Sequence, residues 1–111
     1  MNDCLFCKIV KHEIPSEIVY ENENVLGFKD INPMAKDHFL FISKSHSKNI
    51  NEMSEQDIIS IYSAIKDFTL SKDLETDGFR VVTNVNKHGG QTVFHTHFHL
   101  LAGEQLRGFG A

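Results

Sequence analysis

The clearest periodicity in the chain is helical and lies in its middle third. Apolar residues recur there at spacings of three and four, which places them on one stripe of a helix. The stripe consists of Ile58, Ile61, Tyr62, Ile65 and Phe68. Ser54 stands ahead of it as a candidate N-cap, and Asp57 follows three residues later in a weak form of the capping box. We therefore expect a long helix that packs this stripe on the core, with a partner surface as the alternative role of the stripe.

Shorter apolar runs, each bounded by polar or turn-forming residues, predict strands. They cover residues 18–20, 25–28, 38–42, 79–84 and 96–102. The polar stretch between the first two is typical of a hairpin, and the successive apolar residues of the third indicate a buried strand. Strands arranged around one long helix predict an α+β fold with a five-stranded antiparallel sheet.

The N-terminal segment predicts a second, short helix. Asp3 is its candidate N-cap, Pro15 ends it, and its apolar residues face the core. Those apolar residues are Leu5, Phe6, Ile9 and Val10. No repeat, linker or low-complexity stretch divides the chain, so we expect a single domain over residues 1–111.

Composition narrows the classes of function. With 15 acidic against 11 basic side chains and a net charge of −4, the chain of 111 residues offers no broad surface for a nucleic acid partner. We find no apolar run of membrane-spanning length and no signal peptide, so we expect a cytoplasmic protein without a membrane partner. The unusual features are seven histidines and a Cys4–Cys7 pair.

Three of the histidines alternate with other residues at the start of the last predicted strand. Because successive strand side chains point to opposite faces, His95, His97 and His99 share one face, and Phe98 and Leu100 the other. Three imidazoles in register after a Gly-Gly loop indicate a functional site. A pair of such histidines can also bind a catalytic metal, so the pattern alone leaves metal and nucleophile chemistry open.

Several segments, spread over nearly the whole chain, together resemble the pattern of a known family. They are CLFCKI at 4–9, EIPS at 13–16, FKDINP at 28–33, HFL at 38–40 and GGQTVFHTHFHLL at 89–101. This set resembles the histidine triad (HIT) family and implies a HIT-like fold. It is most similar to the nucleotide-binding branch, whose members hydrolyse purine nucleoside phosphoramidates. Thr96 departs from the family signature, which has an apolar residue there, although its β-branched shape suits a strand.

A neutral imidazole can act as a nucleophile at pH 7, because its unperturbed pKa lies near ~6.5. If one nitrogen of His97 donates to a backbone carbonyl, the other can attack phosphorus and form a covalent intermediate. The resemblance implies this role for His97 and places His99 at a phosphate oxygen or the leaving group. It also places His38 and Asn84 near the phosphate. We expect no catalytic metal.

The phosphate needs hydrogen-bond donors, which the segment before the histidines can supply. Glycine allows backbone N–H groups to approach an anion closely, and Gln91 and Thr92 add side-chain donors. The residues of this segment are Gly90, Gln91, Thr92 and Val93. The resemblance implies that Asp30 binds the ribose hydroxyls, with a turn cap as the alternative role. It also implies apolar walls around the base, with plain core packing as the alternative, at Phe6, Ile9, Phe28 and Ile31.

Cys4 and Cys7 lie one helical turn apart, which suits two thiolates of a zinc site but fixes only half of the ligands. A redox pair and two free thiols are the alternatives. The resemblance adds His46 and His95 as the remaining ligands. The result would be a closed, structural Cys2His2 zinc site that ties the N-terminal helix to the catalytic strand.

The favoured hypothesis is a hydrolase of the P–N bond in purine nucleoside phosphoramidates, which would also bind purine nucleoside monophosphates. The alternatives are a dinucleoside polyphosphate hydrolase of the same fold and a non-catalytic nucleotide-binding or scaffold protein. The resemblance implies a homodimer, to which Ile59, outside the helical stripe, could contribute. His12 and His88 fit none of these roles and are interpreted as solvated loop residues.

Overall fold

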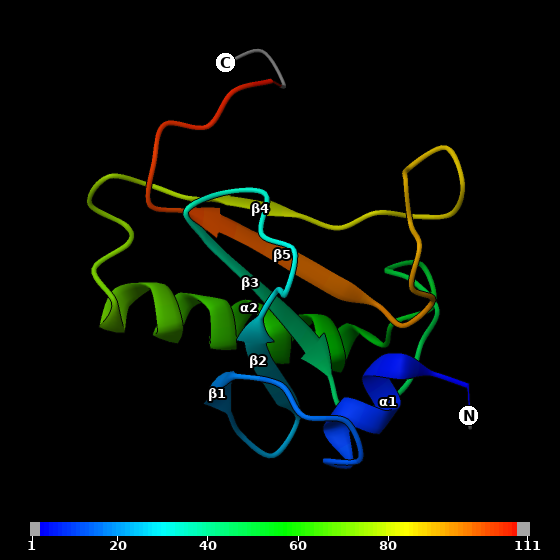
Figure 1. Ribbon diagram of the computed structural model, residues 1–111. Helices are drawn as coiled ribbons and strands as arrows, with labels where there is room; N and C mark the ends of the chain where they lie inside the picture. The colour runs from blue at the N-terminus through cyan, green and yellow to red at the C-terminus, as the bar shows by residue number, and fades with distance from the viewer. Residues whose placement is uncertain (1–2, 109–111) are drawn as a thin grey trace.

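The computed structural model describes residues 3–108, which form one antiparallel sheet and two helices (Figure 1). The elements are α1 (Leu5–Val10), β1 (Ile18–Glu21), β2 (Val25–Lys29), β3 (Asp37–Ser43), α2 (Glu55–Ser71), β4 (Arg80–Val82) and β5 (His97–Ala102). The five strands pair in the order β1-β2-β3-β5-β4, so β1 and β4 are the edge strands. The predicted α+β fold, with a five-stranded antiparallel sheet, one long helix and a short N-terminal helix, is confirmed.

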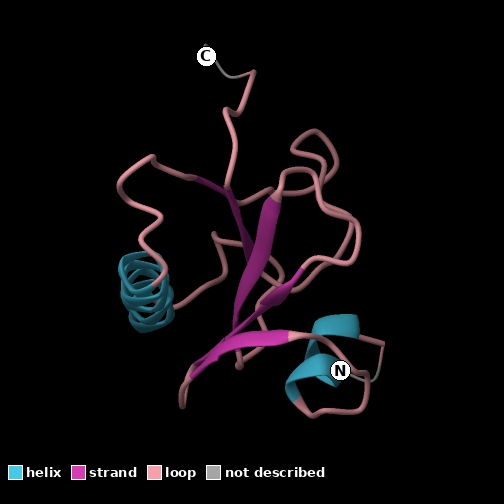
Figure 2. Cartoon of the chain, turned by 60° about the vertical axis from the view of Figure 1, so that its left-hand side comes forward, coloured by secondary structure: helices cyan, strands magenta, loops and turns pink. Residues whose placement is uncertain are grey.

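The two helices lie on opposite sides of the sheet (Figure 2). The alternation along β3 shows how one strand serves both. Phe41 belongs to the apolar cluster under α2, whereas Leu40 and Ile42 belong to the cluster that contains Phe6 and Ile9 of α1. Successive strand side chains point to opposite faces, so the sheet separates two cores.

The core under α2 depends on closely packed aromatic rings. The ring centroid of Phe68 lies 4.9 Å from that of Phe39 and 5.3 Å from that of Phe41. Gly27 on β2 makes room for this packing, because a Cβ there would lie 2.8 Å from Cε2 of Phe41. Any larger residue at this position would displace the ring.

Helix α2 begins where the sequence predicts, because the Ser54 Oγ accepts a hydrogen bond from the Asp57 N–H at 3.0 Å. Its apolar stripe is only partly buried, however. Ile61 is buried, but Ile58 and Tyr62 are 38% and 63% exposed. The expectation that the whole stripe packs on the core is wrong at these two positions, because both line an open groove beside β4.

The N-cap of α1 is Cys4 and not Asp3. The Sγ of Cys4 accepts a hydrogen bond from the Cys7 N–H at 3.1 Å, so a thiol does what a carboxylate was predicted to do. Phe6 and Ile9 are the buried residues of this helix, whereas Leu5, which we expected in the core, is 42% exposed.

Strand β4 is shorter than predicted. It covers only Arg80–Val82 of the expected range 79–84. After it, the Thr83 hydroxyl donates to the His97 carbonyl at 2.8 Å, so a side-chain hydrogen bond joins the two segments where the strand pairing ends. Among the described residues, no helix combines the length and the apolar character that a membrane span requires.

Candidate active site and metal centre

The α1 side of the sheet carries the histidines. The ring centroid of His97, the first residue of β5, lies 5.1 Å from that of Phe6 and 5.0 Å from that of His99. His95, just before the strand, lies 6.1 Å from the same Phe6 ring. Leu100 is buried in the cluster under α2. The backbone therefore divides these residues between the two faces as their alternation predicts.

The backbone fixes the orientation of the His97 ring. Its Nδ1 lies 2.8 Å from the His95 carbonyl and donates to it, so a neutral ring has its proton on Nδ1 and a lone pair on Nε2. Burial lowers the pKa of His97, and the bond to the His95 carbonyl and the charge of Asp30 oppose this only in part. The imidazole is therefore neutral at pH 7, in the form that can act as a nucleophile.

His38 on β3 and His99 on β5 form a second oriented pair. The Met34 N–H donates to Nδ1 of His38 at 3.0 Å, which leaves the proton of a neutral His38 on Nε2. This Nε2 lies 2.9 Å from Nδ1 of His99 and donates to it. The proton of a neutral His99 is then on its Nε2. One backbone N–H thus orients two imidazoles.

Burial keeps this pair uncharged. It lowers the pKa of His38, although Asp30 opposes the effect with Oδ2 at 3.5 Å from Nε2 of His38. Burial, together with the neighbouring His97 and His38, lowers the pKa of His99 to about 4. At neutral pH, His38 and His99 therefore contribute N–H dipoles and not positive charges.

A cavity of about 400 Å³, large enough for a small molecule, opens beside these histidines. Its lining contains most of the residues predicted to contact a nucleotide: Phe6, Ile9, Phe28, Asp30, Ile31, His38, Thr92, Val93, His97 and His99. Phe6, Ile9 and Phe28 are also buried in the core under α1, so the wall and core roles coincide there. Ile31 is 89% exposed and forms the rim.

The position of Asp30 is compatible with both of the roles considered for it. Its Oδ1 accepts a hydrogen bond from the Asn32 N–H at 2.8 Å, which caps the turn after β2. It also lines the cavity, where its Oδ2 approaches His38. One carboxylate oxygen is therefore used in the turn, and the other lies on the cavity side.

Gln91 differs from the expectation. Its side chain is buried, and its Nε2 donates to the carbonyls of Lys48 at 2.6 Å and Val93 at 3.0 Å. Its Oε1 accepts a hydrogen bond from the Asn86 N–H at 2.8 Å. Both side-chain N–H groups are therefore engaged, and the donor that we expected to bind phosphate instead joins two loops.

Asn84 and Gly90 are not among the residues that line the cavity. The Asn84 Nδ2 donates to the Gly89 carbonyl at 2.6 Å, which closes the Gly-Gly loop. Gly90 has φ of 82°, a left-handed conformation that favours glycine. Both residues therefore shape the loop that precedes Thr92 and Val93.

Four thiol and imidazole groups converge where α1 meets the sheet. The Cys4 Sγ lies 3.2 Å from the His95 Nδ1, and the Cys7 Sγ lies 3.3 Å from the His46 Nδ1 and 3.4 Å from the His95 Nδ1. The two Nδ1 atoms are 3.2 Å apart. Ligands of a tetrahedral zinc ion are separated by about 3.3–3.8 Å at usual bond lengths. The four predicted ligands are thus brought together at nearly the spacing of a zinc site.

The hydrogen bonding of His95 fits a metal ligand. Its Nε2 donates to the Ser43 carbonyl at 2.8 Å, so the Nδ1 lone pair faces the two thiols. Burial and the neighbouring Cys4 raise the pKa of the Cys7 thiol to about 11. A thiolate here therefore needs a cation that displaces the proton, and two sulfurs with two imidazoles form a donor set that suits zinc.

A second group, formed by Asp30, His38 and His99, also has ligand atoms within 4.8 Å of one another. Its hydrogen bonds disfavour a metal. A histidine that binds metal through Nε2 has its proton on Nδ1, but the Nδ1 of His38 faces the N–H of Met34. We therefore interpret this group as a hydrogen-bonded cluster of the cavity wall and not as a metal site.

Three orienting groups escaped the sequence analysis. The Met34 N–H and the Ser43 carbonyl are backbone atoms, which no side-chain pattern reveals, and the Thr83 hydroxyl was hidden in a predicted strand. Cavity-lining residues were missed for the same lack of a local signal: Leu5, Ile14, Ser16 and Leu40. His12 and His88 are exposed in turns, as expected.

Comparisons with known proteins identify the family of the domain. A family model described as HIT domain matches residues 11–106. The chain is 37% identical over 107 residues to the purine nucleoside phosphoramidase of Escherichia coli, with coverage of 94% of this chain and 90% of that protein. It is 40% identical over 99 residues to an uncharacterized HIT-like protein of Methanocaldococcus jannaschii, with coverage of 88% and 77%.

Solved structures agree with this result. A HIT family hydrolase from Clostridium thermocellum matches with a TM-score of 0.91 and 42% identity, covering 97% of this chain and 96% of that one. A histidine triad protein from Clostridium difficile matches with a TM-score of 0.92 and 41% identity, covering 98% and 97%. The protein described here therefore belongs to the HIT domain family and is a HIT family hydrolase.

Proposed function

We propose that this hydrolase cleaves the P–N bond of purine nucleoside phosphoramidates through a covalent intermediate on His97. The observation that carries the proposal is the bond from Nδ1 of His97 to the His95 carbonyl, which leaves a lone pair on Nε2 of a cavity-lining residue. The name of the 37% identical relative from Escherichia coli supports the substrate class.

The purine base would lie against the apolar walls, with the ribose hydroxyls donating to Asp30. Nε2 of His97 attacks the phosphorus, and the P–N bond breaks as the Nε2–P bond forms. The amine departs with the bonding electron pair and takes a proton from solvent, which the attack of water in the next step returns. The N–H of His99 donates to a phosphate oxygen as charge develops there. Water then cleaves the Nε2–P bond, which releases the nucleoside monophosphate and restores the neutral imidazole.

Turnover of adenosine 5′-phosphoramidate by the purified protein tests this function. We expect kcat/KM within the usual enzyme range of about 10⁴ to 10⁸ M⁻¹s⁻¹. Mass spectrometry of rapidly quenched enzyme should detect one nucleotidyl adduct, which His97→Ala abolishes and the surface variant His88→Ala retains. Faster turnover of a diadenosine polyphosphate would contradict the substrate class. Nucleotide binding with negligible turnover would instead favour a non-catalytic binding protein.

We propose that Cys4, Cys7, His46 and His95 hold a structural zinc ion. The ion would supply a rigid tetrahedral link between α1 and the segment that carries His97. The spacing of the four donor atoms and the buried orientation of His95 support this assignment. A reducing compartment keeps cysteines as thiols, which can bind a metal, and does not oxidise them to a disulfide. A zinc site with two cysteines therefore supports the cytoplasm as the location.

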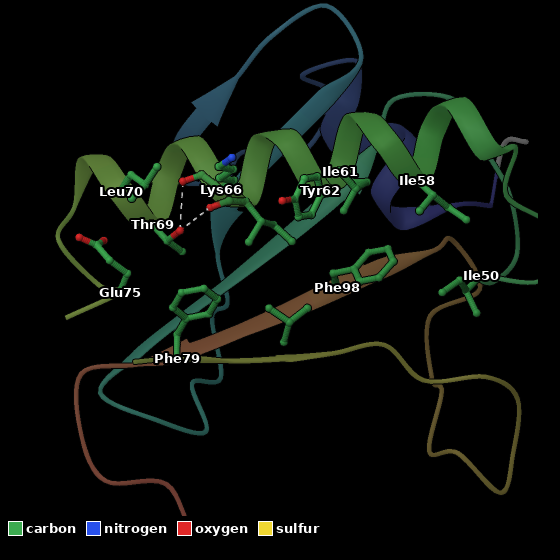
Figure 3. Close-up of a pocket in the computed structure, with 12 residues that line it drawn as sticks. Ile50, Ile58, Ile61, Tyr62, Lys66, Thr69, Leu70, Glu75, Phe79 and Phe98 are labelled. Carbon is green, nitrogen blue, oxygen red and sulfur yellow. Dashed lines mark hydrogen bonds between the residues drawn. The ribbon is translucent and has the colours of Figure 1, made fainter. Parts of the chain in front are cut away.

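We further propose that a second copy of the chain covers the groove between α2 and β4. Figure 3 shows Tyr62 and Ile58 of α2 beside this hollow and Phe79 opposite them. The groove has a volume of about 500 Å³, and Tyr62, Phe79 and Val81 in its lining are 63%, 38% and 42% exposed. The edge strand β4 beside it has backbone groups that can pair with another strand. Ile59 is 55% exposed but does not line the groove.

Sedimentation velocity tests the dimer. We expect the wild-type protein at twice the chain mass of 12.6 kDa. Val81→Lys should shift it to the monomer, because a charge would have to be buried in the interface. Ile18→Lys is a matched control, since Ile18 lies on the opposite edge strand and is 37% exposed, close to the 42% of Val81. A wild-type monomer, or dissociation by both variants, would contradict the proposed interface.

A further inference from the structure

Thr96 lies between the metal ligand His95 and the nucleophile His97, at a position where the HIT signature has an apolar residue. It is 1% exposed, so its hydroxyl cannot be satisfied by solvent. An unpaired hydroxyl in this environment would destabilise the protein. The chain avoids that cost through a partner on another segment.

The partner is Ser47, which directly follows the metal ligand His46. The Thr96 N–H donates to the Ser47 carbonyl at 2.8 Å, and the Thr96 hydroxyl is 3.1 Å from the same carbonyl. The two hydroxyl oxygens are 2.6 Å apart. The directions are consistent if Thr96 Oγ1–H donates to the carbonyl and accepts from Ser47 Oγ–H. We call this group of three bonds the Ser47–Thr96 clasp.

Gln91 connects the same two parts of the chain one residue further along, by the bond from its Nε2 to the Lys48 carbonyl. The loop that carries His46 is thus attached at adjacent residues to the segment that carries Thr92, Val93 and His97. Neither attachment touches the cavity or the four metal-binding atoms. Both therefore act on position and not on chemistry.

We propose that Thr96 and Ser47 are positioning residues, which hold His46 in register with His95 and so couple the metal centre to the strand that carries the nucleophile. The two imidazole ligands come from segments 49 residues apart in the chain, and their Nδ1 atoms lie 3.2 Å apart. The clasp attaches the residues that directly follow each ligand, His46 and His95. This inference depends on the proposed metal centre but not on the identity of the substrate.

Metal affinity tests the inference without any assay of activity. The metal-free protein is titrated with Co²⁺, followed by the thiolate-to-cobalt absorption, and Zn²⁺ affinity is obtained by competition. We expect Thr96→Val to weaken binding by about tenfold, because orienting hydrogen bonds near metal ligands have effects of this size. Thr96→Ser retains the hydroxyl and should bind nearly as well as wild type.

Ser47→Ala should weaken binding less than Thr96→Val, because the Thr96 hydroxyl keeps its bond to the Ser47 carbonyl. The double variant should resemble Thr96→Val, since both changes remove the same interaction. Ser45→Ala is the matched control. Ser45 directly precedes His46 in the chain, but its hydroxyl donates to Asp57 of α2 at 2.6 Å, so its loss should leave affinity unchanged.

Equal affinity in all variants, with only the melting temperature reduced, would overturn the proposal in favour of a purely structural hydroxyl pair. Equal losses in Thr96→Ser and Thr96→Val would also overturn it, because the methyl group would then be responsible. A wild-type protein that binds no metal would overturn both this inference and the metal centre. The expected order of affinities in a protein that fails to cleave phosphoramidates would support the clasp and contradict only the proposed substrate.

Discussion

His95 and His97 are two residues apart on one side of the sheet, yet the structure gives them opposite tautomers. His95 donates from Nε2 to the Ser43 carbonyl and presents Nδ1 to two thiols. His97 donates from Nδ1 to the His95 carbonyl and leaves Nε2 free for chemistry. The side chains are identical, so the backbone carbonyl that each one meets determines which nitrogen has the lone pair.

The surroundings of His95 and His97 also differ, one being closed and the other open. His95 is 0% exposed and is enclosed by Cys4, Cys7 and His46, so the group has no open position for a substrate. His97 is 7% exposed and lines a cavity with apolar walls. A closed set of four donors suits a structural ion, whereas an open imidazole suits nucleophilic attack. The comparison shows how one short segment, which leads into β5, can place a buried group suited to a structural ion two residues from a reactive imidazole.

The largest expected effects, on activity and on zinc content, come from replacing His97 and His95 one at a time. We predict that His97→Ala lowers kcat/KM for adenosine phosphoramidate by about 10⁴-fold or more, because no other group supplies the nucleophile. Its zinc content, measured by elemental mass spectrometry, should equal that of wild type. His95→Ala should lose the zinc. Loss of zinc in His97→Ala with activity retained would reverse the two assignments.

Removal of one thiol should abolish metal binding at the proposed centre and leave the His97 side chain present. We predict that Cys7→Ser loses zinc. A metal present at about 100 times its Kd stabilises a protein by about 2.7 kcal/mol, so the melting temperature should fall by roughly 10–20 °C at this chain length. Calorimetry with and without a chelator measures this shift. A wild-type protein whose melting temperature does not respond to the chelator would contradict a structural metal.

The sequence predicts those parts of the fold that local chemistry determines. The start of α2 at Ser54 follows from a side chain that caps a backbone group three residues away. Strand β4 ends at Val82, and the next residue, Thr83, bonds through its side chain to His97, 14 residues further on, which no local pattern reveals. The thiol cap at Cys4 was missed because cysteine is not among the usual N-cap residues.

The candidate site likewise contains residues whose place the sequence predicts and residues whose place it does not. Strand alternation alone places His97 and His99 on one face, and the family resemblance adds His46, which lies 49 residues from His95 in the chain. Gln91 was assigned to the phosphate because its side chain can donate. The sequence could not show that its donors would meet the carbonyl of Lys48, 43 residues away.

A smaller effect is expected at Asp30, which also lines the cavity. We predict that Asp30→Asn raises KM by about 10-fold or more, because a hydrogen bond from ribose to a carboxylate contributes about 1.5–3 kcal/mol. The asparagine Oδ1 can still accept the Asn32 N–H, so the turn is preserved. A dideoxyribose substrate is the control, since wild type and variant should bind it equally well. A KM increase that persists with this substrate would indicate a structural role.

The smallest effect concerns the charge of His99. Its pKa is about 4 in the folded protein against an ordinary value of 6.5, so between these two pH values the unfolded chain binds more protons. Stability from this residue is therefore complete above about pH 6.5 and is lost as the pH falls towards 4. Between pH 7 and 5.5 we expect wild type to lose up to about 1 kcal/mol more stability than His99→Gln and His99→Asn, because His38 and His97, whose pKa values burial also lowers, titrate in all three proteins. Denaturant unfolding at saturating zinc measures this difference, and parallel pH profiles would show that His99 is not held neutral by its surroundings.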